Sequence, residues 1–191
     1  MSHSTSEFLN KIPAFRGLTQ EEIVDILRTL QPISYQAGEI IFRENDEGKG
    51  AFIIQEGKIE IFISDAQKSL TVTRLHAGEI FGELALIDGA PRSAGARSLT
   101  QCELLFIEKR EFDYLRRQLR PAAFHLLRIF ANELCLRIRE TNEQIESILV
   151  GAKAEQRGGT VVISARNESI EQVKDEESGV LSRFFSLFKS I

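Results

Sequence analysis

The first thirty residues follow a helical pattern of apolar positions with one interruption. Apolar side chains recur at helical spacing through residues 7–30, and Pro13 breaks the run. Thr19 stands where a helix N-cap is favoured, with Glu22 three residues later at the spacing of a capping box. The pattern predicts short N-terminal helices, the second of them beginning after Thr19.

From residue 32 to residue 108 the period of the pattern changes to two. Apolar residues alternate with polar ones, and glycines recur between the short runs. The alternating positions are Ile33/Tyr35, Ile40/Phe42, Phe52/Ile54, Ile59/Ile61/Ile63, Val72 and Leu104/Phe106. Short strands joined by glycine turns predict an all-β roll or barrel, and the flanking helices make the whole chain α+β.

A second helical pattern spans residues 121–150 and is longer than a roll of this size needs as a cover. Its apolar residues are expected to form one side, with charged residues on the other. They are Phe124, Leu127, Ile129, Phe130, Leu134, Ile138, Ile145 and Ile148. With the roll, this helix completes an expected domain over residues 1–150.

The composition changes again at Gly151. Residues 151–179 are polar and charged, without apolar periodicity apart from a short apolar run at 160–163, which predicts a flexible linker. Residues 180–191 place large apolar groups on one face of a helix and predict an amphipathic C-terminal segment. That segment is expected to contact a protein rather than a membrane surface, since Arg183 and Lys189 are its only cations.

The composition narrows the classes of function. Of 191 residues, 42% are hydrophobic and 27% charged, as in ordinary globular proteins, and no run reaches the ~18 apolar residues of a membrane span. The N-terminus lacks the features of a secretory signal, so a cytoplasmic location is expected. A net charge of -4 gives no general attraction to nucleic acid. Cys102 and Cys135 are expected to be small core residues.

Residues 78–94, GEIFGELALIDGAPRSA, carry the candidate chemistry. Gly82 permits close backbone approach, and a short helix opening at Glu83 presents free N–H groups to an anion. Arg92 offers a guanidinium, and the Glu83 carboxylate accepts hydrogen bonds from a hydroxyl. Each residue alone is common on a solvated surface, but their order within a glycine-rich β segment favours a ligand site.

This run resembles the phosphate-binding cassette of cyclic-nucleotide-binding domains, the family of catabolite activator proteins and protein kinase A regulatory subunits. Residues 37–41 and 52–62 resemble the first hairpins of that family, and the resemblance extends from Phe8 to Ser147, about three quarters of the chain. It implies a double-stranded β-helix, a jelly-roll-like β-roll, with short N-terminal helices, a cassette helix and a long C-terminal helix.

The resemblance also implies roles for individual residues. Glu83 would bind the ribose 2′-hydroxyl, Arg92 the phosphate, and Ser93 either the phosphate or the exocyclic amine of guanine. The backbone would line the site at Gly82, Leu84, Ala85 and Ala94. Thr141 and Asn142, on the long helix, would meet the base, although in a helix they could equally face solvent. The implied ligand is cyclic AMP, since Thr141 and Asn142 lean towards adenine, and cyclic GMP is an open alternative because Ser93 leaves guanine possible.

The resulting hypothesis is a stand-alone cyclic-mononucleotide receptor that is not an enzyme and needs no metal or other cofactor. His3, His76 and His125 lie in unrelated segments and form no catalytic or metal-ligand pattern. The residues after the long helix are too few and too acidic for a helix-turn-helix module, so no DNA binding is expected.

Ligand binding would pass through the C-terminal helix and residues 180–191 to a protein partner, with a homodimer through that helix as a further possibility. The alternative is a β-roll scaffold that binds no ligand and acts through its C-terminus. The sequence leaves open the partner, the oligomeric state, and whether the C-terminal segment docks on a partner, a membrane or its own domain.

Overall fold

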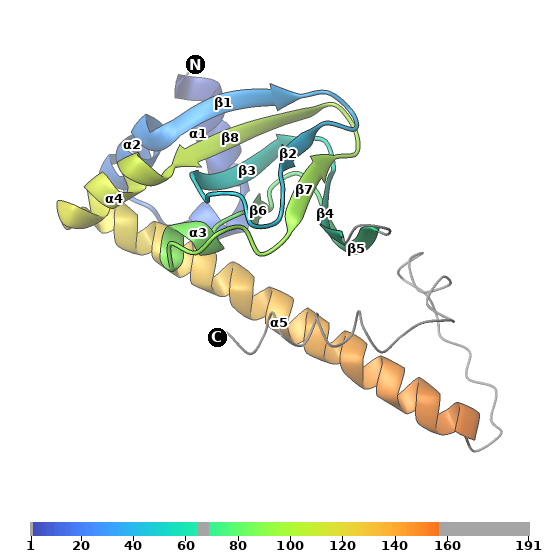
Figure 1. The fold of residues 1–191 in the computed structure, drawn as a ribbon. Coiled ribbons are helices and arrows are strands. Elements are labelled where there is room, and N and C mark those ends of the chain that lie inside the picture. The colour runs from blue at the N-terminus through green and yellow to red at the C-terminus, as the bar shows by residue number, and fades with distance from the viewer. Residues whose placement is uncertain (1, 65–68, 157–191) are drawn as a thin grey trace. The chain divides into compact units, whose positions relative to one another are not determined.

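The computed structural model describes residues 2–64 and 69–156. The chain divides into two compact units, Met1–Cys135 and Leu136–Ile191. The first unit holds the strands, the N-terminal helices and the first turns of the last helix (Figure 1). The predicted linker from residue 157 onward, its run at 160–163, and the amphipathic segment 180–191 lie outside the described residues.

Three helical elements open the chain: α1 (Ser2–Lys11), the 3-10 helix η1 (Pro13–Phe15) and α2 (Gln20–Thr29). The break at Pro13 and the start after Thr19 confirm the prediction. The capping box is formed: the Thr19 side chain accepts a hydrogen bond from the Glu22 N–H at 3.3 Å, and Glu22 Oε2 accepts one from the Thr19 N–H at 2.7 Å.

The described residues contain eight strands, which form two antiparallel four-stranded sheets. They are β1 (Leu30–Tyr35), β2 (Ile40–Phe42), β3 (Gly50–Glu56), β4 (Ile59–Ser64), β5 (Ser69–Leu75), β6 (Ile80–Phe81), β7 (Gly95–Ser98) and β8 (Cys102–Glu108). One sheet has the order β1-β8-β3-β6 and the other β2-β7-β4-β5 (Figure 1). The chain therefore crosses repeatedly between the sheets, and the predicted β-roll is confirmed.

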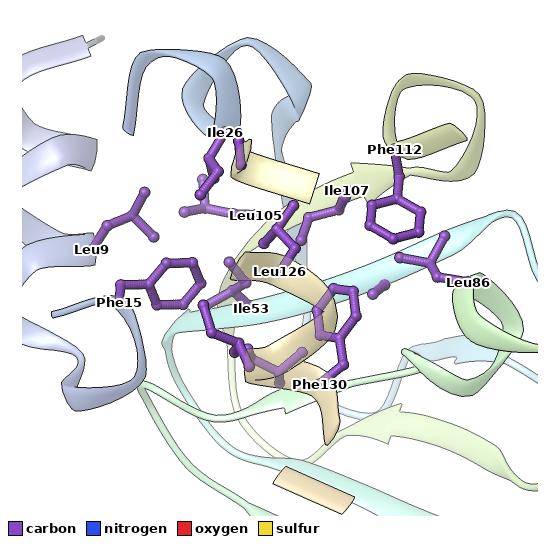
Figure 2. Close-up of a cluster of buried hydrophobic side chains, with 14 of the residues drawn as sticks. Leu9, Phe15, Ile26, Ile53, Leu86, Leu105, Ile107, Phe112, Leu126 and Phe130 are labelled. Carbon is purple, nitrogen blue, oxygen red and sulfur yellow. The ribbon is translucent and has the colours of Figure 1, made fainter. Parts of the chain in front are cut away.

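The central strand β3 is buried on both faces of its sheet, and its side chains alternate between two clusters. Phe52 and Ile54 of β3 pack into the space between the two sheets, with residues of the other sheet such as Ile59 and Ala96. On the opposite face, Ala51 and Ile53 join a second cluster that also receives side chains from the helices (Figure 2). The members of β8 divide between the two clusters in the same way.

Three further helices complete the described chain: α3 (Leu84–Ile87), α4 (Lys109–Arg117) and α5 (Pro121–Gln156). The sequence pattern had not predicted α4, whose nine residues are mostly charged and bury only Phe112 and Leu115. Two apolar positions three residues apart are too few to show a helical period. The helix α5 ends at Gln156, beyond the predicted end near residue 150.

The prediction that α5 has one apolar side is wrong, because its apolar residues lie on two faces. Leu126, Ile129 and Phe130 are buried in the cluster of Figure 2, at 0–1% exposure. Phe124 and Ile138, by contrast, are 54% and 40% exposed. The core-facing residues all fall in the first ten positions of the helix, so the other apolar face is not used by the core of the first unit.

The two cysteines differ. Cys102 is buried between the sheets as predicted, but Cys135 on α5 is exposed, so the prediction of a core position is wrong for Cys135. Among the helices of residues 2–64 and 69–156, none combines the length and the apolar character that a bilayer crossing requires.

Candidate functional site

The candidate site is built around Arg92, which lies in the loop between α3 and β7 and is only 6% exposed. The loop that follows β2 holds its main chain. The Arg92 N–H donates to the Asp46 carbonyl at 2.9 Å, and the Arg92 carbonyl accepts from the Asn45 N–H at 2.8 Å. Asn45 adopts a positive φ of 67°, which turns the chain at this point. Two loops distant in sequence therefore fix the backbone of Arg92.

The guanidinium of Arg92 is held by two backbone carbonyls. Its Nη1 donates to the Gly82 carbonyl and its Nη2 to the Gly50 carbonyl, both at 2.7 Å. Its Nε is buried and has no hydrogen-bond partner among the described residues. Because a guanidinium carries five N–H donors, Nε–H and the second hydrogen of a neighbouring Nη remain for a further acceptor. That pair matches two oxygens of an anion such as a phosphate.

Gly82 permits this contact by its conformation and its lack of a side chain. Its φ is +73°, in the left-handed region that favours glycine. A Cβ atom at this position would lie 2.6 Å from Arg92 Nη1, too close for any real contact. The next residue, Glu83, is the N-cap of α3 and is 1% exposed. The sequence Gly82-Glu83 thus brings a buried carboxylate to the place where the arginine is anchored.

The charges of the site compensate one another in part. Burial lowers the pKa of the Arg92 guanidinium below its ordinary value, and the carboxylates of Glu83 and Asp46 counter that shift. The guanidinium of Arg92 only donates hydrogen bonds and the carboxylate of Glu83 only accepts them. The first can therefore bind an anion while the second binds a hydroxyl beside it.

The other predicted residues of the cassette are also in the first unit. Ala85 is buried within α3, and Leu84 and Ala94 are half-buried. Ser93 is exposed, directly after Arg92. The Ala85 carbonyl accepts a hydrogen bond from Lys109 Nζ at 3.3 Å, which ties α3 to the start of α4. The fold brings Arg92 next to Gly82 and Glu83, as the motif predicted.

Thr141 and Asn142 lie on α5 in the second unit, outside the unit that holds the cassette. Thr141 is half-buried and Asn142 exposed. Their assignment to the base stays a prediction.

Sequence reasoning missed the partners that hold Arg92, namely Phe42, Gly50 and the Asn45-Asp46 turn. The Cζ atom of Arg92 lies 4.1 Å from the centroid of the Phe42 ring. Phe42 and Gly50 precede Arg92 by more than forty residues, and each has an ordinary explanation, Phe42 as a strand residue and Gly50 as a turn. No local signal in the sequence links them to the arginine.

A family model of the cyclic nucleotide-binding domain matches residues 32–118, a range that includes both sheets beyond the first strand residues and all of the cassette. Residues 32–118 are therefore similar to the cyclic nucleotide-binding domain. Domains of this family are regulatory binding modules.

Curated relatives support the assignment of the cyclic nucleotide-binding domain. The chain is 34% identical over 113 residues to a cAMP-dependent protein kinase regulatory subunit of Dictyostelium discoideum, covering 57% of this chain and 35% of the relative. It is 31% identical over 135 residues to the cyclic AMP receptor protein of Thermus thermophilus, covering 70% of this chain and 61% of the relative. The chain thus spans between about a third and three fifths of the length of these relatives.

Among solved structures, the domain is similar to a putative cyclic nucleotide-binding protein from Geobacter metallireducens. The TM-score is 0.62 at 25% sequence identity, and the match covers 70% of this chain and 98% of the other. The match therefore spans nearly the whole of that protein.

Proposed function

We propose that the protein is a receptor for a cyclic mononucleotide, with cyclic AMP as the first choice of ligand and cyclic GMP as the second. The observation that carries the proposal is the buried guanidinium of Arg92, whose Nε has no hydrogen-bond partner among the described residues. A buried donor without an acceptor costs free energy, so its retention favours a role in binding. A cyclic phosphodiester supplies one negative charge and two oxygens for it.

The remaining parts of the cassette suit the rest of a cyclic nucleotide. Glu83 would accept a hydrogen bond from the ribose 2′-hydroxyl, and the backbone at Gly82, Leu84, Ala85 and Ala94 would line the phosphate. Both curated relatives are named for cyclic AMP, which supports this nucleotide over cyclic GMP. We expect binding without chemical conversion, and no metal or other cofactor.

The packing of α3 supports a route by which binding would reach α5. Leu86 of α3 is 1% exposed and belongs to the same cluster as Phe112 of α4 and Phe130 of α5 (Figure 2). A shift of the cassette helix would therefore change the packing of the first turns of α5. A ligand moves such an equilibrium only by its difference in affinity between the two states.

The exposed face of α5 supports a protein contact as the output. Phe124, Ala131 and Ile138 are exposed, whereas Leu134 is half-buried and Leu127 packs in part against the core cluster. Together these five residues follow one another at spacings of three and four, the repeat of a helix that pairs with another. A second copy of the chain would satisfy this repeat, and residues 180–191 remain the proposed contact with a different protein. The oligomeric state, measured by sedimentation with and without nucleotide, tests the first of these partners.

Calorimetric titration with cyclic AMP and cyclic GMP in parallel tests the receptor. We expect saturable binding of at least one nucleotide to the wild-type chain. Arg92→Ala should weaken it by about 10- to 100-fold, since a hydrogen bond to a charged group contributes about 1.5–3 kcal/mol. The matched control is Arg110→Ala, an arginine on α4 whose side chain is 75% exposed, which should bind as the wild type does.

A folded wild-type chain that binds neither nucleotide would reject the receptor and favour the scaffold that acts through its C-terminus. Binding that Arg92→Ala and Arg110→Ala leave equally strong would show that the nucleotide is held elsewhere.

A further inference from the structure

The ring of Phe42 forms a platform beneath the cation of the candidate site. Phe42 is the last residue of β2, and the Cζ atom of Arg92 lies 4.1 Å from its ring centroid. This distance is well inside the ~6 Å range of a cation–π interaction. The carbonyls of Gly82 and Gly50 bind the edge of the same guanidinium, so its face and its edge are held by different groups.

The platform itself is fixed by other aromatic rings. The Phe42 centroid is 6.0 Å from that of Phe52 and 6.0 Å from that of Phe81, and these two rings stack on each other at 5.0 Å. Phe52 and Phe81 are 5% and 1% exposed, as expected for core residues. Because densely packed rings have few alternative rotamers, the plane of Phe42 has little freedom to turn.

The same short segment also holds the main chain of Arg92. Asn45 and Asp46 lie three and four residues after Phe42. The Asn45 N–H donates to the Arg92 carbonyl at 2.8 Å, and the Arg92 N–H donates to the Asp46 carbonyl at 2.9 Å. Segment 42–46 therefore fixes both the backbone position of Arg92 and the plane of its guanidinium. What remains of the guanidinium is the Nε edge, which has no hydrogen-bond partner among the described residues.

We propose that Phe42 is a positioning residue for anion binding, which acts through Arg92 and keeps its guanidinium in the one orientation that presents the Nε edge to the ligand. The inference rests on the proposed function. An aliphatic side chain at this strand position would leave the guanidinium face without this attraction. The ring thus sets affinity by raising the fraction of molecules in which Arg92 is already placed for binding.

The size of the effect follows from that fraction. The apparent dissociation constant is the intrinsic constant divided by the fraction of the protein that is competent to bind. Cation–π interactions at partly or fully desolvated sites are strong enough to change such a fraction by about 5- to 10-fold. The two carbonyl contacts remain when the ring is replaced, so we expect weakening rather than loss of binding.

The test replaces Phe42 with phenylalanines carrying one, two and three ring fluorines. Fluorine withdraws the negative charge from the ring face while the ring keeps nearly its shape, so the cation–π attraction weakens in steps without a cavity. Calorimetry with cyclic AMP measures affinity, and thermal unfolding of each variant measures stability. The same substitutions at Phe112, a fully buried ring of the other cluster, control for fluorine in the core.

We expect the dissociation constant for cyclic AMP to rise stepwise with the number of fluorines at Phe42, while unfolding temperatures stay close to the wild type and the Phe112 series stays flat. Phe42→Leu should bind about 5- to 10-fold more weakly, and Phe42→Tyr should restore the affinity because it restores an electron-rich ring. In an Arg92→Gln background the dependence on fluorine should vanish.

A flat Phe42 series in a wild-type protein that binds cyclic AMP overturns the role of Phe42 and leaves the receptor intact. A wild-type chain that binds neither cyclic AMP nor cyclic GMP overturns the receptor itself and the positioning role with it. Equal losses in the Phe42 and Phe112 series also overturn the positioning role, since they would reflect the core rather than the arginine.

Discussion

Arg92 and Gly82 are mutually dependent in this structure. The Nη1 of Arg92 donates to the Gly82 carbonyl at 2.7 Å, and a Cβ on residue 82 would lie 2.6 Å from that same nitrogen. A side chain at residue 82 would force the guanidinium to shift, and the φ of +73° seen here favours glycine. The glycine is thus part of the arginine's binding geometry and more than a turn residue.

Gly82→Ala should therefore weaken nucleotide binding about as much as Arg92→Ala does, by about 10- to 100-fold. The methyl group displaces the guanidinium, and the positive φ adds backbone strain of about 1 kcal/mol or more to the folded state. Calorimetry gives the first effect and urea unfolding the second. Gly38→Ala is the matched control, since its φ is +85° and nothing lies within 4 Å of its added Cβ. Equal effects of the two variants on affinity would contradict the prediction.

Glu83 should discriminate between ribose and 2′-deoxyribose. The wild-type chain is expected to prefer cyclic AMP over 2′-deoxy cyclic AMP by about 10- to 100-fold, because a charged acceptor would lose its partner. In Glu83→Gln, which keeps the shape and removes the charge, the preference should shrink to within about tenfold. Paired titrations of both nucleotides with both proteins measure this ratio. An unchanged ratio would show that Glu83 does not bind the 2′-hydroxyl.

Ser93→Ala should separate the two cyclic nucleotides. Ser93 is exposed, so removal of its hydroxyl should leave the fold intact. If the hydroxyl meets the exocyclic amine of guanine, affinity for cyclic GMP should fall about 2- to 10-fold, and affinity for cyclic AMP should stay the same. Competition between the two nucleotides is a direct measurement. An equal fall for both would place the hydroxyl on the phosphate instead.

The N-terminal capping box should make stability depend on pH. The backbone N–H of Thr19 lowers the pKa of Glu22 most, the Thr19 hydroxyl, His125 and Arg128 lower it further, and burial partly opposes them. A folded pKa below the ordinary 4.5 means that this stabilisation is complete above pH 4.5 and is lost as the pH falls through the lower, folded value. His125 Nδ1 lies 2.8 Å from Glu22 Oε1, so the cap also ties α2 to α5.

Glu22→Ala should accordingly lower the free energy of unfolding by about 1 kcal/mol at pH 7. The difference in free energy of unfolding between variant and wild type should narrow below pH 4.5. There the protonated Glu22 of the wild type accepts weaker hydrogen bonds from Thr19. Urea unfolding at a series of pH values measures both. Glu21→Ala is the control, an adjacent and largely exposed glutamate outside the capping box. A difference that stays constant with pH would show that the carboxylate charge is not involved.

Local patterns predicted those parts of the structure that local chemistry decides. The break at Pro13, the cap at Thr19 and the alternation that makes the strands each depend on a few neighbouring residues. The cassette was recognisable for the same reason, because Gly82, Glu83 and Arg92 lie within eleven consecutive residues. In these features, residues that are close in the sequence are also close in the structure.

What the sequence could not predict depends on contacts between distant segments. Phe42 alternates correctly as a strand residue, and nothing near it indicates that its ring meets a cation from another loop. The two carbonyls that hold Arg92 are backbone groups, which every residue possesses, so no residue type marks them. The two faces of α5 were merged because a list of apolar positions does not say which of them a neighbouring element covers.

The burial of β3 on both faces limits where a spectroscopic reporter can be attached. Positions 51–54 pack into either the roll interior or the helical cluster, so a dye attached there would disrupt the fold. Most side chains of β5, by contrast, reach solvent, including Val72, Thr73 and Arg74. A fluorophore on β5 would lie on the same sheet as β7, the strand that follows Arg92. It could report nucleotide binding in real time without disturbing the packing of the core.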